Sequence, residues 1–330
     1  MMEPVVVVDA AGVPTPAASK DVLRDAAAGI AVVVTVPAWF GMADRHRLVT
    51  DIDPDRTCSA GLVSSTLAGA YGHFARMTRE GPSSTVLCLD VRYGWSAGLV
   101  RFTADGVAEL ASWAVAPHEL TGMLHDDAAA AALVDAVLNA AAAVAGGDTV
   151  HSVLVIDDVG QHAALIGDVV RRSGRWARCD VVVVDAWPVM HGAVSLRQRP
   201  DPGRRSVGAL TYSLMVRADD DPEQPTMHVV AARHAPIPST TRLTFALGPD
   251  DGAPLHFDVF EDPRGIADDH ADDHADERLV LRAHLMRERG FDQNMVITFD
   301  LGADGLLSIG PTKAWRLEWQ PGSSAIGAVP

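Results

Sequence analysis

The chain has 330 residues, of which 48% are hydrophobic, so it is long enough to bury the cores of two domains. Its formal net charge is -16, from 43 acidic and 27 basic residues. This balance argues against a nucleic-acid or anionic-membrane partner, because either would require a basic patch on the protein.

The cysteines and the first residues bear on the compartment. Cys58, Cys88 and Cys179 are odd in number and far apart, so they predict neither a disulfide framework nor a metal cluster. The opening MMEPVVVVDAAG carries an acidic residue where an export signal would carry positive charge. The longest apolar stretch, residues 29–42, is too short to span a bilayer. We expect a cytoplasmic protein with no membrane span.

The first half of the chain alternates between two patterns. Runs rich in β-branched residues predict buried strands at 29–41, 84–91, 151–158 and 179–187. Between them, residues 126–145 predict a helix that ends at Gly146 and Gly147. One face of this helix is apolar and carries Leu133, Val134, Val137, Leu138, Ala141 and Val144. The alternation predicts an α/β domain whose sheet is covered on both faces.

After Arg199 the pattern changes. The segment RPDPGRR, residues 199–205, is rich in proline and arginine and is typical of a solvated linker between domains. Beyond it, short alternating strands separated by turns are predicted within residues 210–216, 226–231, 241–247, 255–260, 294–301 and 305–310. These strands predict a second, all-β domain built as a sandwich.

Segments of the first half resemble, in order, the seventy-kilodalton heat-shock chaperones of the DnaK type. VVVTVPAWFGMADRHRLV (32–49) is similar to their Val-Thr-Val-Pro-Ala-Tyr-Phe strand and the helix after it. STLAGAYG (65–72) resembles their alanine-rich helix, and residues 153–172 resemble the strand and helix of their adenosine motif. DAWPVMHGAV (185–194) is similar to their closing helix.

The second half resembles the substrate-binding sandwich of the same family. Residues 229–262 follow it closely and include a counterpart of the Arg-Asn-Thr-Thr-Ile-Pro signature at Arg233–Pro238. Residues 296–310 are similar to Val-Thr-Phe-Asp-Ile-Asp-Ala-Asp-Gly. The resemblance implies a divergent, N-terminally truncated relative with three parts: a partial actin-like ATPase domain (1–198), a linker (199–207) and a lidless β-sandwich (208–330).

The resemblance places the family's second phosphate loop on CLDVRYGWSAG, residues 88–98. Glycines there let backbone N–H groups approach phosphate, but Arg92 and Tyr93 replace two of them. What remains of a nucleotide site would be Asp90, Gly94 and Asp157. Asp90 is either a relic of the catalytic carboxylate or the cap of a turn.

A second residue needed for ATP hydrolysis is also missing. The family has a carboxylate that orients the metal ion where this chain has LVSS (62–65), which contains no acidic residue. We therefore expect a degenerate ATPase with no cofactor, or with ATP and magnesium if the site still binds them. No nucleophile elbow or HExxH motif provides an independent enzyme signature.

The apolar substrate pocket of the family transfers by position to five residues of the sandwich: Val216, Met227, Phe245, Leu255 and Phe257. Alternation along the strands fits either a groove or the core of the sandwich. An extended peptide could pair its main chain with such a sheet and insert one side chain. The resemblance therefore implies unfolded or extended apolar polypeptide segments as partners.

One candidate metal site lies outside the resemblance. ADDHADDHADE, residues 267–277, places His270 and His274 four residues apart, a spacing that can hold a transition metal on a helix. The same letters also form a tandem repeat typical of a solvated acidic loop.

Three functions follow as expectations. The first is a chaperone-like holdase or adaptor that binds polypeptide without an ATP cycle. The second is an ATP-dependent folding chaperone that retains nucleotide binding, and the third is a non-catalytic structural interaction protein.

Overall fold

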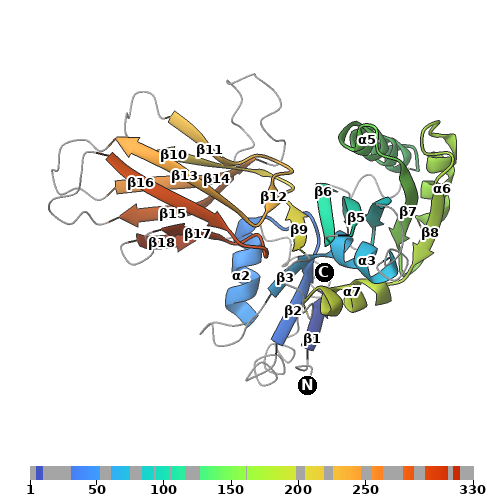
Figure 1. Ribbon diagram of the computed structural model, residues 1–330, viewed down its shortest axis with the longest axis horizontal. Helices are drawn as coiled ribbons and strands as arrows, with labels where there is room; N and C mark the ends of the chain where they lie inside the picture. The colour runs from blue at the N-terminus through green and yellow to red at the C-terminus, as the bar shows by residue number, and fades with distance from the viewer. Residues whose placement is uncertain are drawn as a thin grey trace. The chain divides into compact units, whose positions relative to one another are not determined.

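The computed structural model describes residues 5–9, 31–52, 61–74, 84–92, 94–104, 106–115, 127–160, 162–197, 205–218, 226–246, 255–262, 278–285, 294–310 and 315–319 (Figure 1). They form a mixed α/β structure with several β-sheets, which confirms the coarse fold class. The chain divides into two compact units. The described residues up to Phe40 and from Leu48 to Ala209 form the α/β unit, and Gly41–Arg47 with those from Leu210 onward form the β-rich unit.

The main sheet of the α/β unit begins as an antiparallel meander of β4 (Ser84–Asp90), β5 (Trp95–Thr103) and β6 (Gly106–Val115). β7 (Val150–Ile156) and β8 (Asp180–Val184) then continue it parallel to β4, with the order β6-β5-β4-β7-β8. The strands predicted at 84–91, 151–158 and 179–187 are confirmed. β5 and β6 were not predicted.

The predicted linker is wrong over its last residues. β9 (Arg205–Ala209) extends the same sheet and pairs in parallel with β6, where Val107 lies opposite Ser206. Residues 205–207 are therefore strand. Residues 198–204 lie outside the described part of the chain.

Helices cover both faces of this sheet, as the alternating pattern predicted (Figure 1). α5 (Asp127–Ala145) and α6 (Ala163–Arg172) share one apolar core with the sheet, and α3 (Ser65–Phe74) and α7 (Trp187–Arg197) share the other. The helix predicted at 126–145 is thus confirmed. The buried face of this helix differs from the predicted one at its last residue: Val144 is 41% exposed, and Ala145 is buried instead.

α5 is also long and apolar enough, by length and composition alone, to cross a membrane. In this fold its Val134, Leu138 and Ala141 are buried in the core with the sheet. The expectation of no membrane span stays a prediction.

α3 and α7 cross closely because both carry glycine at the crossing. A Cβ on Gly72 would overlap the carbonyl oxygen of Pro188, and a Cβ on Gly192 would overlap that of Ala68. Any larger residue would push the helices apart, so these two glycines set the spacing of the layer.

A smaller parallel sheet completes the unit with the order β1 (Val5–Asp9), β2 (Ala31–Val36), β3 (Gly61–Ser64). β2 is the strand predicted at 29–41, and it ends at Pro37, where the missing N–H stops the ladder. α2 (Met42–Ile52) follows it.

The β-rich unit is built from two antiparallel sheets. The larger has the order β11-β10-β14-β15-β18 and comprises Thr226–Ala231, Ser213–Ala218, Leu255–Asp262, Arg278–Leu285 and Trp315–Trp319. The smaller has the order β13-β16-β17 and comprises Ser239–Ala246, Asn294–Leu301 and Leu307–Gly310. β12 is the short segment Pro236–Ile237.

Buried residues of both sheets form one hydrophobic core, so the unit is a sandwich. All six strands predicted in this half exist. β15 and β18 were missed: the apolar run of RLVLRAHL breaks strict alternation, and WRLEW alternates regularly but is only five residues long.

Candidate functional site

The predicted nucleotide remnant lies where β4 ends. Asp90 is the last residue of the strand and is 4% exposed. The Arg92 guanidinium donates from Nε to one carboxylate oxygen and from Nη2 to the other, both at 2.9 Å. The Arg92 main-chain N–H lies 3.4 Å from the first of these oxygens. Asp90 therefore forms a buried bidentate ion pair across its own turn.

Gly94 allows the backbone conformation of this turn. Its φ of 138° lies in a region that side-chain-bearing residues rarely adopt, so glycine there lets the chain enter β5. Tyr93 lies outside the described residues. The glycine that the resemblance links to phosphate thus has a structural role of its own.

Asp157, the other predicted carboxylate, follows β7 and is 7% exposed. Its oxygens accept the main-chain N–H groups of Val159 at 3.2 Å, Gly160 at 2.9 Å and His162 at 2.9 Å. The side chain therefore holds the turn that leads into α6.

The ends of β4, β7 and β8 lie side by side. The Val91 N–H donates to the Ile156 carbonyl at 3.1 Å, and the Asp157 N–H donates to the Val184 carbonyl at 2.9 Å. The two carboxylates that the resemblance assigns to a nucleotide remnant therefore lie at neighbouring strand ends, at the carboxyl edge of the sheet.

The described residues at this edge do not fit a magnesium–nucleotide complex. A cation would have to displace the Arg92 guanidinium from Asp90 and three backbone donors from Asp157. Across the described part of the chain, no group of three or more His, Cys, Asp or Glu side chains could hold a metal ion. His270 and His274 lie outside that part.

A third buried carboxylate in this unit was not predicted. Glu109 on β6 is 2% exposed and accepts hydrogen bonds from Thr66 Oγ1 at 2.6 Å and Ser64 Oγ at 3.3 Å. The Ala209 N–H donates to its other oxygen at 3.3 Å. Gly98 opens the space, since a Cβ there would overlap this carboxylate. A lone glutamate in the apolar strand GVAELASWAV was the available signal.

The predicted peptide pocket is wrong for three of its five residues. Val216, Phe245 and Phe257 are 0%, 3% and 2% exposed and belong to the core of the sandwich. The Phe245 and Phe257 rings lie 4.7 Å apart across the two sheets. Met227 on β11 is half-buried, and the Leu255 side chain lies outside the described part.

The physical reason is the ambiguity of a period of two. Alternation shows that Phe245 shares one face of its strand with its apolar neighbours, but not whether that face meets solvent or another sheet. β13 and β14 belong to different sheets whose inner faces share one core, so both phenylalanines are covered.

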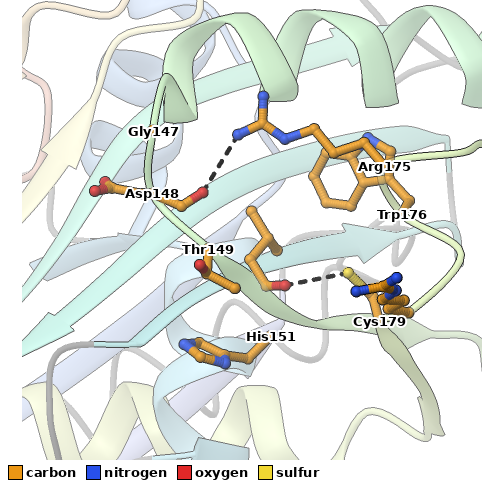
Figure 2. Close-up of a pocket in the computed structure, with 9 residues that line it drawn as sticks. Gly147, Asp148, Thr149, His151, Arg175, Trp176 and Cys179 are labelled. Atoms are coloured by element: carbon orange, nitrogen blue, oxygen red, sulfur yellow. Dashed lines mark hydrogen bonds between the residues drawn. The ribbon is translucent and has the colours of Figure 1, made fainter.

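A pocket of about 370 Å³ opens at the other end of β7 (Figure 2). The Arg175 guanidinium donates to the Asp148 carbonyl at 3.3 Å, as Figure 2 shows by a dashed line. The Cys179 thiol donates to the Val150 carbonyl at 3.2 Å. Arg175 also donates to the carbonyls of Ala142 and Gly146, so it caps the C-terminus of α5. Burial raises the pKa of the Cys179 thiol, which disfavours the thiolate. The pocket brings together helix-capping groups and no activated nucleophile.

Four large apolar side chains on or next to the ends of β7, β8 and α7 are exposed. Val159, after β7, is 75% exposed, and Val183 on β8 is 47% exposed. Trp187 and Met190, at the start of α7, are 56% and 39% exposed. Trp187 stacks on His191, with ring centres 4.9 Å apart and planes at 17°. These exposed side chains were not predicted.

Comparison of the chain with models of known protein families and with curated proteins finds no significant match. The site is therefore interpreted from its own geometry.

Proposed function

We propose that the chain is a non-catalytic, chaperone-like protein that binds extended apolar polypeptide segments, as a holdase or adaptor without an ATP cycle. The observation that carries the proposal is the edge strand β8. It is the last strand of the sheet order, and no strand of the described chain pairs with its outer side. That side presents a row of main-chain donors and acceptors.

β8 has the features of a strand that accepts another. Its sequence is DVVVV, and it pairs with β7 in regular register from Asp180 to Val184. It contains no proline, lysine or bulge, the usual devices that protect an edge from pairing. An added segment would gain main-chain hydrogen bonds from β8 and apolar contact with the exposed Val183.

Trp187 and Met190 are further exposed apolar side chains, carried by α7 on the face of the sheet opposite to Val183. The stack on His191 holds the Trp187 ring in place, which lowers the entropy lost when a partner covers it. Exposed aromatic and methionine side chains suit partners of varied sequence. An apolar, extended polypeptide is the partner whose chemistry matches the unpaired edge of β8.

The absence of an ATP cycle is proposed from the Asp90–Arg92 pair. Both oxygens of the carboxylate that the resemblance assigns to the nucleotide site accept hydrogen bonds from one guanidinium. The kinship itself also stays a proposal. It is supported by the element order and by α3 and α7, the counterparts of two family helices, which pack together at Gly72 and Gly192.

The test is titration of a fluorescent, extended apolar peptide into the full chain. We expect saturable micromolar binding that Val183→Asp weakens at least tenfold. Val296→Asp is the matched control, because Val296 is a 55% exposed strand valine of the sandwich. Absence of saturable binding, or equal binding by the Val183→Asp protein, would reject the proposal.

Calorimetry with ATP and magnesium tests the second half of the proposal. We expect no binding heat. Micromolar ATP binding would overturn the non-catalytic assignment and favour an ATP-dependent chaperone.

A further inference from the structure

We propose that His256 and His284 form a binding site for a divalent transition-metal ion such as Cu²⁺, Ni²⁺ or Zn²⁺. β14 and β15 place the two residues directly opposite each other in the larger sheet of the sandwich. Their Nδ1 atoms lie 2.6 Å apart, and the rings are nearly perpendicular at 87°. Two imidazole nitrogens therefore converge on one point.

The pair is close to the geometry that a metal requires. At 2.6 Å one Nδ1 donates a proton to the other, so one ring carries its hydrogen there and its neighbour accepts. A tetrahedral ion with nitrogen bonds of about 2.0–2.1 Å holds two ligand nitrogens roughly 3.3 Å apart. The rings would separate by less than about 1 Å as the ion replaces the shared proton. His256 is exposed, which gives it room for that movement.

Glu318 supplies the outer partner of such a site. β18 pairs with β15, and the Glu318 carboxylate lies 3.7 Å from Nε2 of His284. This Nε2 is buried and accepts or donates no hydrogen bond within the described chain. With Nδ1 on a metal, Nε2 carries the proton and faces the carboxylate, the arrangement that orients metal-bound histidines.

The charged residues around the two histidines determine how many protein ligands the metal would have. Asp258 is held by Arg217 at 2.7 Å and by Arg282 at 3.4 Å, so it is not available as a third ligand. Since the described residues contain no cluster of three metal-binding side chains, water would complete the coordination. With only two protein ligands, the site would exchange its ion readily. Among the divalent ions named, Cu²⁺ should bind most tightly, because affinity at nitrogen ligands rises from Ni²⁺ to Cu²⁺ and falls again at Zn²⁺.

The test is Cu²⁺ titration of the full chain at neutral pH, with electron paramagnetic resonance as the readout. We expect a two-nitrogen signal in the wild-type protein and at least tenfold weaker occupancy of that site in His256→Gln. His228→Gln is the matched control, because His228 also lies in this sheet but packs on Phe245, and it should bind like the wild type. Equal two-nitrogen signals in the His256→Gln and wild-type proteins would overturn the proposal.

The repeat at 267–277 is the competing source of copper ligands. We expect the His270→Asn and His274→Asn double variant to retain the two-nitrogen signal. Its loss in that variant would assign the copper to the repeat and reject the strand pair. Thermal unfolding with Zn²⁺ gives a second readout: the ion should raise the Tm of the wild type more than that of His256→Gln. An equal rise in both proteins would also count against the site.

Discussion

The α/β unit and the sandwich bury acidic side chains in opposite ways. In the α/β unit, Asp90 is bound by an arginine and Glu109 by two hydroxyls and a main-chain N–H. In the sandwich, Glu261 on β14 is 4% exposed. Its carboxylate accepts a hydrogen bond from the main-chain N–H of Met42. Burial raises the pKa of Glu261 to about 7, although Arg278 opposes the shift.

The surroundings of Glu261 explain the difference. Asp44 adds a like charge, and burial raises the pKa of Asp44 as well. The buried Tyr212 hydroxyl has no hydrogen-bond partner within the described chain, and burial together with Glu261 raises its pKa. The α/β unit thus holds carboxylates with matched donors, whereas the sandwich holds one that takes up a proton near neutral pH.

The largest effect on stability is expected from breaking the ion pair between Asp90 and Arg92. Arg92→Ala leaves Asp90 buried without its guanidinium, so the free energy of unfolding should fall by about 3–5 kcal/mol. Arg171→Ala is the control, because Arg171 and Asp168 form an exposed pair whose loss should cost less than about 1 kcal/mol. Urea unfolding measures both. Equal effects would show that the Asp90 pair is no stronger than a surface contact.

The second prediction concerns pH. Glu261 titrates near 4.5 when unfolded and about 7 when folded, so the folded protein binds the extra proton between these values. Its favourable contribution is complete below pH 4.5 and is lost as the pH rises through 7. Stability should fall by on the order of 3 kcal/mol over this window.

Glu261→Gln should remove that slope, and Asp158→Asn, which changes an exposed acid, should keep it. Urea unfolding at pH 5 and pH 8 measures the difference. An unchanged slope in Glu261→Gln would mean that this carboxyl ionises normally in the fold.

The smallest expected effect concerns the donors to Glu109. Thr66→Val keeps the shape of a buried residue but removes the 2.6 Å hydrogen bond to Glu109. The free energy of unfolding should fall by about 1–3 kcal/mol. Thr103→Val, at an exposed strand end, should change it by less than about 0.5 kcal/mol. A Thr66→Val protein as stable as the wild type would show that the remaining donors satisfy Glu109.

Sequence reasoning performed differently at the two candidate sites. It predicted the strands that end at Asp90 and before Asp157, because buried strands show as apolar runs, but only the structure shows that these strands pair with each other. It could not place Phe257 inside or outside the sandwich, because the same alternation serves both. It also missed the exposed apolar side chains near β8, since edge and central strands of a parallel sheet share one composition.

The sequence alone indicated an alternation of buried strands with helices before residue 199, a run of short strands after it, and an arginine and a tyrosine in the turn after Asp90. These follow from local chemistry: side-chain periodicity, turn residues and backbone freedom. Only the tertiary structure decided that Arg92 closes on Asp90, that Phe245 meets Phe257, and that His256 faces His284. The turn after β4 sets the first of these contacts, whereas sheet packing and strand register set the other two, which join residues distant along the chain.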